Sequence, residues 1–132
     1  MKVLVAGTFD GFHPGHLHYF EQAKKQGDYL MVVVARDSIV ERERGSPPVI
    51  NEDDRLALVK SIRHVDFAVL GNETDKLKTV EDLRPDIICL GYDQNVDEKQ
   101  LKGELEKRGI RITIKRMLPY KPQSCKSRNL FL

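Results

Sequence analysis

The sequence predicts an α/β protein whose core is a doubly wound, five-stranded parallel sheet. Five short apolar runs alternate with segments of helical periodicity along the 132 residues. The connections between successive apolar runs are too long for hairpins, so neighbouring strands should run parallel, with helices on both faces. The chain shows no repeat and no internal linker, and we therefore expect a single domain over residues 1–132.

The five strands are expected at residues 2–6, 29–35, 65–70, 86–90 and 110–115. The first two runs are almost wholly apolar, as is typical of central strands that are buried on both faces. The last run alternates apolar and polar residues in the manner of a strand at a sheet edge. Sheets of this kind bind ligands at the carboxyl ends of their strands, where the strand order reverses.

The helices are expected at residues 14–26, from residue 51 or 52 onward, at 77–83 and at 96–108. The long helices carry apolar side chains three or four residues apart on one face: Leu17 and Phe20, then Leu56, Val59 and Ile62, then Leu101 and Leu105. Gly27, Pro85 and Gly109 stand where helices should end. Residues 36–48, polar and ending in two prolines, predict a loop with at most one helical turn, and residues 118–132 a tail.

The composition is that of an ordinary globular protein, with 40% apolar and 32% charged residues. A net charge of +2 argues against a nucleic-acid partner. No apolar run approaches the roughly 20 residues of a membrane span, and the apolar N-terminal run is too short for a signal peptide. Two cysteines far apart make no disulfide framework. We therefore expect a cytoplasmic protein without a membrane partner.

Residues 7–16, which read Gly-Thr-Phe-Asp-Gly-Phe-His-Pro-Gly-His, join the first strand to the first helix. Three glycines, four positions apart, let the backbone turn tightly and approach a ligand, and Pro14 suits the first helical position. His13 and His16 lie on one side of the first helical turn because they are three residues apart. Free N–H groups and the positive end of the helix dipole point the same way, so this helix start is suited to binding phosphate.

The glycine spacing matches neither the dinucleotide fingerprint G-x-G-x-x-G nor the Walker P-loop. The block G-T-F-D-x-x-H-x-G-H instead resembles the cytidylyltransferase-like nucleotidyltransferase superfamily, which has a Rossmann-like fold, and Gly91-Tyr92-Asp93 resembles its G-x-D motif. Within that superfamily the chain resembles the archaeal-type FAD synthases over nearly its whole length. The features are the H-P-G-H form, Val-Val-Ala-Arg-Asp at 33–37, Leu-Gly-Tyr-Asp-Gln at 90–94 and Leu-Pro-Tyr at 118–120 leading to a cysteine.

The resemblance implies an FMN adenylyltransferase that converts ATP and FMN into FAD and pyrophosphate. His13 and His16 are then the catalytic residues, donating N–H bonds to phosphate oxygens as charge builds on them. The residues implied to line the ATP site are Thr8, Phe9, Asp10, Pro14, Gly15, Asp93 and Tyr120. Two of these have local alternatives: Asp10 could cap the helix or turn the loop, and Asp93 could cap the next helix instead of meeting the ribose or base.

Basic residues are the expected phosphate contacts. The resemblance points to Arg42 and Arg44 in the polar loop and to Arg55 at the start of the second helix. Glu41 and Glu43 interleave with the loop arginines, which favours a solvated role for at least one of them. Lys126 lies in the tail, where many relatives carry a Ser/Thr-rich phosphate-binding segment that is only partly kept here.

Mg²⁺ or another divalent cation is expected to be held by phosphate oxygens and water and not by a protein cage. A zinc site built from the histidines and Cys89 lacks a paired C-x-x-C and leaves the glycines unexplained. The resemblance also suggests a homodimer, with Arg63 and Asp66 at the subunit contact. Two other functions stay open: a glycerol-3-phosphate cytidylyltransferase-like enzyme that uses CTP, and a nucleotide-binding regulator that has lost catalysis.

Overall fold

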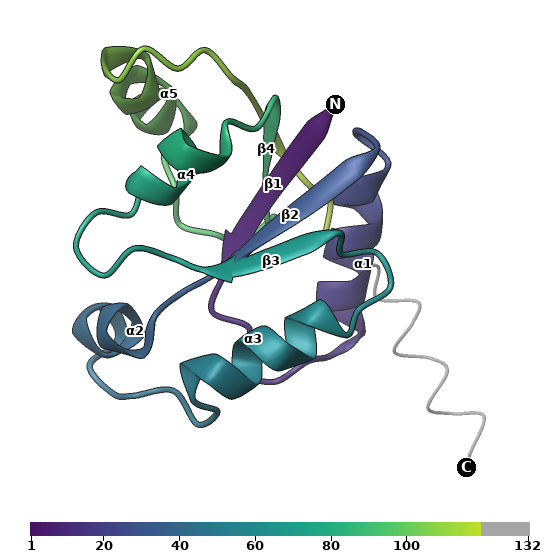
Figure 1. Ribbon diagram of the computed structural model, residues 1–132, viewed down its shortest axis with the longest axis vertical. Coiled ribbons are helices and arrows are strands. Elements are labelled where there is room, and N and C mark those ends of the chain that lie inside the picture. Colours follow the sequence, from purple (N-terminus) through teal and green to yellow (C-terminus); the bar gives the residue numbers. More distant parts are fainter. Residues whose placement is uncertain (120–132) are drawn as a thin grey trace.

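A twisted five-stranded sheet lies at the centre of the structure, a computed structural model that describes residues 1–119 (Figure 1). Its strands are β1 (Lys2–Gly7), β2 (Tyr29–Val34), β3 (Phe67–Leu70), β4 (Ile87–Leu90) and β5 (Thr113–Arg116). They lie in the order β3-β2-β1-β4-β5, and every neighbouring pair is parallel. The predicted doubly wound, parallel five-stranded sheet is therefore confirmed.

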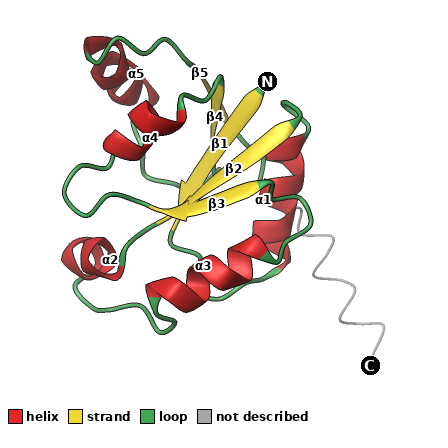
Figure 2. Cartoon of the chain, viewed as in Figure 1, coloured by secondary structure: helices red, strands yellow, loops and turns green. Residues whose placement is uncertain are grey.

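Helices pack on both faces of this sheet (Figure 2). One face carries α1 (Pro14–Lys24) and α3 (Glu52–Lys60), and the other carries α4 (Lys78–Leu83) and α5 (Glu98–Lys107). Side chains of β1 alternate between the two cores: Val3 and Val5 join the first, whereas Leu4 joins the second. This alternation explains why the strand is continuously apolar, since both of its faces are covered.

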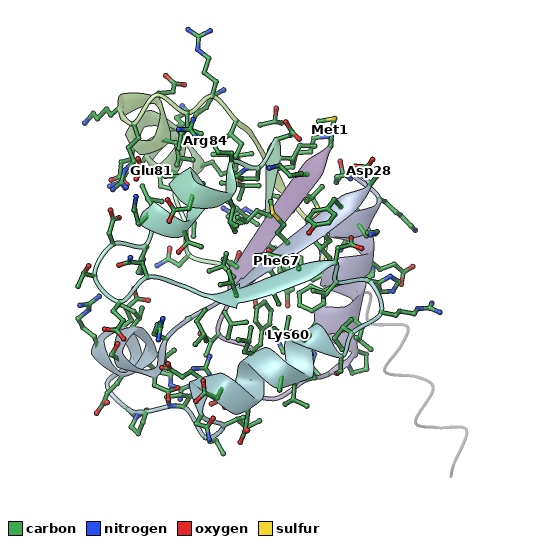
Figure 3. All side chains as sticks on the ribbon, viewed as in Figure 1. Met1, Asp28, Lys60, Phe67, Glu81 and Arg84 are labelled. Atoms are coloured by element: carbon green, nitrogen blue, oxygen red, sulfur yellow. The ribbon has the colours of Figure 1, made fainter. Side chains whose placement is uncertain are left out.

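The second face is covered by helices only in part. Figure 3 shows Glu81 on α4, Arg84 at the end of that helix, and Phe67 on β3. Phe67 is 39% exposed. A cavity opens on the same face, between the sheet and α4 and α5.

Residues 36–48 differ from the predicted loop, because they contain the eight-residue helix α2 (Asp37–Arg44). Its buried side chains, Ile39 and Val40, are adjacent in sequence, so the apolar spacing that marks a longer amphipathic helix is missing. The helix ends at Gly45, whose φ of 86° lies in the left-handed region that glycine adopts easily.

The strand order reverses at β1, which has β2 on one side and β4 on the other. The carboxyl ends of β1 and β4 therefore flank the crevice where sheets of this type bind ligands. Gly7 ends β1 and Gly91 directly follows β4. No helix within residues 1–119 is long and apolar enough to cross a membrane.

Candidate active site

In the turn from β1 into α1, backbone N–H groups hold the rings of the two histidines that were predicted to be catalytic. His13 is the N-cap of α1 and its Nδ1 accepts the N–H of Gly15 at 3.0 Å. In return, Nδ1 of His16 accepts the N–H of His13 at 3.3 Å. The two rings lie side by side, with centroids 4.0 Å apart.

These backbone bonds determine which ring nitrogen of each histidine carries the proton. A nitrogen that accepts a hydrogen bond bears no hydrogen, so in the neutral rings of His13 and His16 the proton lies on Nε2. Burial lowers the pKa of His16 below its usual 6.5, and the neighbouring charge of His13 lowers it further, against a smaller opposite effect of Asp93. At neutral pH His16 therefore offers an Nε2–H donor and no positive charge.

Glycine is required at position 15 because the His13 ring lies against the backbone there. A Cβ on Gly15 would be 2.6 Å from Cε1 of that ring, closer than real contacts allow. Gly7 is constrained in the same way by the Phe9 ring, whose Cζ would be 2.8 Å from an added Cβ. Phe9 itself has a φ of 55° and packs edge-on against His16 at 5.7 Å.

A cleft of about 560 Å³ opens beside this turn, at the carboxyl ends of β1 and β4. Eight residues predicted for the site line it: Thr8, Phe9, Asp10, His13, Gly15, His16, Arg44 and Asp93. Pro14 occupies the first position of α1, as predicted. The topology and the family resemblance thus lead to the same place.

Asp10 has a local role that differs from the predicted helix cap. Its carboxylate accepts the N–H groups of Ile50 at 2.8 Å and Val49 at 2.9 Å, and it pairs with Arg44 at 3.4 Å. These bonds hold the pKa of Asp10 below its usual value, and the hydrogen bond from Ile50 has the largest effect, followed by that from Val49. Asp10 therefore fixes the segment before α3 to the turn between β1 and α1 while its side chain lines the cleft.

Arg55 was predicted to contact phosphate, but its side chain is fully buried. Its guanidinium donates to the carbonyl of Thr8 at 2.7 Å, to that of Ile50 at 2.8 Å and to Asp37 at 2.6 Å. With these donors engaged inside the protein, Arg55 supports the turn between β1 and α1 and does not line the cleft.

The other predicted contact residues divide into three groups. Arg44 lines the cleft and also donates to the carbonyl of Pro47 at 2.9 Å. Arg42 is exposed on α2 and is not among the residues that line the cleft. Tyr120 and Lys126 lie outside the described residues, and the structure says nothing of their place.

The loop after β4 forms the opposite wall of the cleft. Asp93 lines this wall, and α5 is capped by Asp97, which accepts the N–H groups of Lys99 and Gln100. The alternative in which Asp93 caps the helix is therefore wrong. Asp93 is thus available to a ligand.

Sequence reasoning missed three residues that shape the cleft. Gln94 accepts the N–H of Gly91 at 2.8 Å and donates to the carbonyl of Ala6 at 2.7 Å, tying the loop to β1. The Arg116 guanidinium binds the carbonyls of three loop residues: Gly91 at 3.0 Å, Gln94 at 2.7 Å and Val96 at 2.8 Å. The loop is hence fixed before any ligand binds.

Tyr19 is the third of these, and it forms part of the cleft lining. Its hydroxyl donates to the carbonyl of Cys89, and burial raises its pKa far above the usual value. Cys89 is fully buried, as the apolar strand predicted, and burial raises the pKa of its thiol to about 11. The H-x-G-H and G-x-D motifs are recognisable in the sequence, whereas most of these other contacts join residues far apart along the chain.

Protein metal ligands are not gathered in the part of the chain that the structure describes. Residues 1–119 contain no group of three or more His, Cys, Asp or Glu side chains that could hold a metal ion.

Comparison with protein families gives a match to the cytidylyltransferase-like family over residues 4–128. The FAD synthase of Aciduliprofundum boonei is 52% identical, over 91% of this chain and 80% of that protein. The FAD synthase of Methanohalophilus mahii is 48% identical, over 94% of this chain and 84% of that protein.

Solved structures agree with this match. A protein of Thermoplasma volcanium, described as a lipopolysaccharide core biosynthesis protein, superposes with a TM-score of 0.88 at 47% identity, over 92% of this chain and 98% of that one. Pantoate-beta-alanine ligase from Francisella tularensis shares the fold alone, with a TM-score of 0.61 at 16% identity over 99% of this chain and 65% of that one. The chain belongs to the cytidylyltransferase-like family and, within it, to the group of archaeal FAD synthases.

Proposed function

We propose that this protein is an FMN adenylyltransferase, which transfers AMP from ATP to FMN and releases pyrophosphate. The observation that carries the proposal is the pair of Nε2–H donors of His13 and His16 at the start of α1, inside the cleft at the strand reversal. The identity with proteins named FAD synthase favours ATP and FMN over the CTP-dependent alternative.

The reaction requires charge stabilisation and alignment more than proton transfer. An oxygen of the FMN phosphate forms a new bond to the α-phosphorus of ATP, the bond from that phosphorus to the α,β-bridging oxygen breaks, and pyrophosphate leaves with the electron pair. A phosphate monoester has its second pKa at about 6, so the attacking oxygen is already ionised near neutral pH. No general base is needed, which agrees with histidines whose Nδ1 atoms already accept backbone bonds.

His13 and His16 are assigned to the transferring phosphates. Their Nε2–H groups face the oxygens on which negative charge develops in the transition state. The backbone N–H groups of His13, Gly15 and His16 already bond within the turn, so the imidazoles and not the backbone are the donors. Arg44, at the rim of the cleft, adds a guanidinium suited to phosphate oxygens. Asp93, on the opposite wall, is the candidate acceptor for hydroxyl groups of the ribose or an amine of the base.

Mg²⁺ or another divalent cation, held mainly by ATP phosphates and water, would neutralise part of the phosphate charge. Removal of divalent ions with EDTA should stop FAD formation, and Mg²⁺ should restore it. A homodimer is a prediction from the family resemblance, and a cytoplasmic location is a prediction from the sequence composition. Light scattering of the purified protein tests the first, and fractionation of cells that produce it tests the second.

A panel of substrates tests the proposed activity. Purified protein is given ATP or CTP together with FMN or glycerol 3-phosphate, and pyrophosphate release is measured. ATP with FMN should give the fastest release, with FAD as the second product. Faster turnover of CTP with glycerol 3-phosphate would assign the chain to the cytidylyltransferase alternative, and absence of turnover with every pair would favour a non-catalytic regulator.

A further inference from the structure

A second cavity, of about 390 Å³, lies on the sheet face that carries α4 and α5. Its floor is formed by side chains of β1 and β4, including Leu4, Ala6 and Leu90, and its roof by α4 and α5. The volume is in the range of small-molecule sites, and the lining combines eight apolar residues with six polar or charged ones.

Ala6 is the unusual residue of this cavity. It lies on β1, the central strand, which pairs with β2 and β4, and the three residues before it are buried. Ala6 is nevertheless exposed. Because parallel sheets are normally covered on both faces, an exposed small residue at the carboxyl end of the central strand marks a place that a ligand can cover.

The second cavity adjoins the histidine cleft at a single residue of the described chain, Gln94, which lines both. Its side chain bridges Ala6 and Gly91, and Arg116 holds its carbonyl. The partition between the two cavities is therefore fixed, and both open at the end of β1.

The roof of the cavity is also held in place. Arg108, which follows α5, binds Asp75 at 2.9 and 3.0 Å and Glu81 of α4 at 2.8 Å. Lys76 lines the cavity and forms an ion pair with Glu43 of α2. An opening that is framed by such contacts is formed before any ligand arrives, which reduces the cost of binding.

We infer that this cavity holds the isoalloxazine ring of FMN while the FMN phosphate extends past Gln94 to the α-phosphorus of ATP. The inference rests on the proposed function, which requires FMN and ATP to be bound together. ATP occupies the histidine cleft, so the acceptor needs a neighbouring site. A flat ring with apolar faces and polar edges matches an apolar floor with Asn95, Gln100 and Glu104 among its lining residues.

The substitution Ala6→Leu tests this inference, because the larger side chain would fill part of the cavity from its floor. The matched control is Ala57→Leu, which makes the same change at an exposed position of α3 that lines none of the described cavities. FMN is titrated into each protein without ATP, and binding is read from flavin fluorescence. We expect Ala6→Leu to weaken FMN binding about tenfold or more, because the added side chain takes up space on the floor that the flavin ring would otherwise fill. ATP binding, read by calorimetry, should be unchanged in both variants.

A second variant guards against misfolding of the first. Gln100→Trp places a bulky ring among the lining residues from an exposed position of α5, where it does not disturb the core. It too should weaken FMN binding with ATP binding intact. Circular dichroism shows which variants are folded, and any folded blocking variant that binds FMN as well as the parent overturns the inference.

The parent protein separates failure of the inference from failure of the proposed function. If the parent forms FAD but the blocking variants keep full FMN affinity, the enzyme is an FAD synthase whose flavin binds elsewhere. If the parent binds FMN in a manner that Ala6→Leu abolishes but forms no FAD, the cavity is supported and the proposed function is wrong. If the parent binds no FMN, the inference is overturned.

Discussion

At the scale of single residues, the site depends on how the backbone holds His16. Its Nδ1 accepts the N–H of His13, which leaves Nε2–H for the substrate. We predict that His16→Ala lowers turnover about 100-fold or more, the usual cost of losing one such donor. His16→Gln, whose amide offers a donor near the position of Nε2, should recover part of the loss.

The control for this prediction is His64→Ala, since His64 lies outside the cleft. It should turn over like the parent in the same pyrophosphate-release assay. Thermal unfolding should show that His16→Ala stays folded and loses no more than a capping bond, about 1 kcal/mol. Turnover of folded His16→Ala within a few-fold of the parent would remove His16 from the mechanism.

The pKa of His16 gives a second prediction at this scale. Burial and, second, the charge of His13 lower it below 6.5, so the unfolded chain binds more protons than the folded one in the window beneath that value. Stability should therefore fall as pH decreases through this window. In a proton NMR titration, the His16 ring should have its midpoint below 6.5 and shift upward in His13→Ala. A parent midpoint above 6.5 would contradict the neutral donor.

Sequence patterns predicted the histidines but not the role of every charged residue. His13 and His16 are recognisable because their spacing, the glycines and Pro14 are local features of one turn. Arg55 was assigned to phosphate because its position resembles that of an arginine in the family. Its true partners include the carbonyl of Thr8, 47 positions away, and carbonyls carry no sequence signal.

At the scale of elements, Gly45 and Gly103 should respond in opposite ways to the same change. Gly45 ends α2 with a φ of 86°, where a Cβ is strained, so Gly45→Ala should destabilise the fold by about 1 kcal/mol. Gly103 lies inside α5 with nothing within 4 Å of an added Cβ. Gly103→Ala should therefore stabilise by about 0.5 to 1 kcal/mol. Urea unfolding measures the free energy of unfolding of both variants. A stabilising Gly45→Ala would contradict the end assigned to α2, and a destabilising Gly103→Ala would contradict the open space beside Gly103.

The loop after β4 depends on Arg116. Its guanidinium binds three carbonyls of the loop that carries Asp93, and an ammonium cannot span them. We predict that Arg116→Lys and Arg116→Met both raise the Kd for ATP by about tenfold, which corresponds to roughly 1.4 kcal/mol.

The matched control for the loop is Arg111→Met, because Arg111 is exposed and lines a different surface. Calorimetric titration with ATP compares the three variants. An unchanged Kd in folded Arg116→Met would mean that the loop holds its shape without the guanidinium. If Arg111→Met raised the Kd for ATP as much as Arg116→Met does, the effect would come from the loss of positive charge in general.

Most helices and strands were predictable from the spacing of apolar residues and from the Gly and Pro residues at their ends, but α2 was not. Continuous apolar runs predicted β1 and β2 almost to their ends. The last strand begins at Thr113 and not at residue 110, although Ile110 and Ile112 are buried, because burial by itself does not make a strand pair. α2 has only two buried side chains, so its short apolar face was hidden among Glu and Arg.

At the scale of the whole molecule, strand order brings the site together. Five alternating units predicted a parallel sheet, and the reversal at β1 places the turn before α1 opposite the loop after β4. The second cavity was not predictable in this way. It arises because α4 and α5 leave Ala6 exposed, and how far a helix extends over a sheet depends on packing between distant segments.

The measurement that tests the central claim most directly follows the α-phosphorus of ATP. Purified protein in excess is mixed with FMN, Mg²⁺ and ATP labelled at that phosphorus, and the products are separated after a single turnover. The label should appear in FAD, with one pyrophosphate released per FAD, and His16→Ala should form the same product far more slowly. Label that is found in AMP or on the protein and never in FAD, or that enters FAD equally fast without His16, would contradict the account.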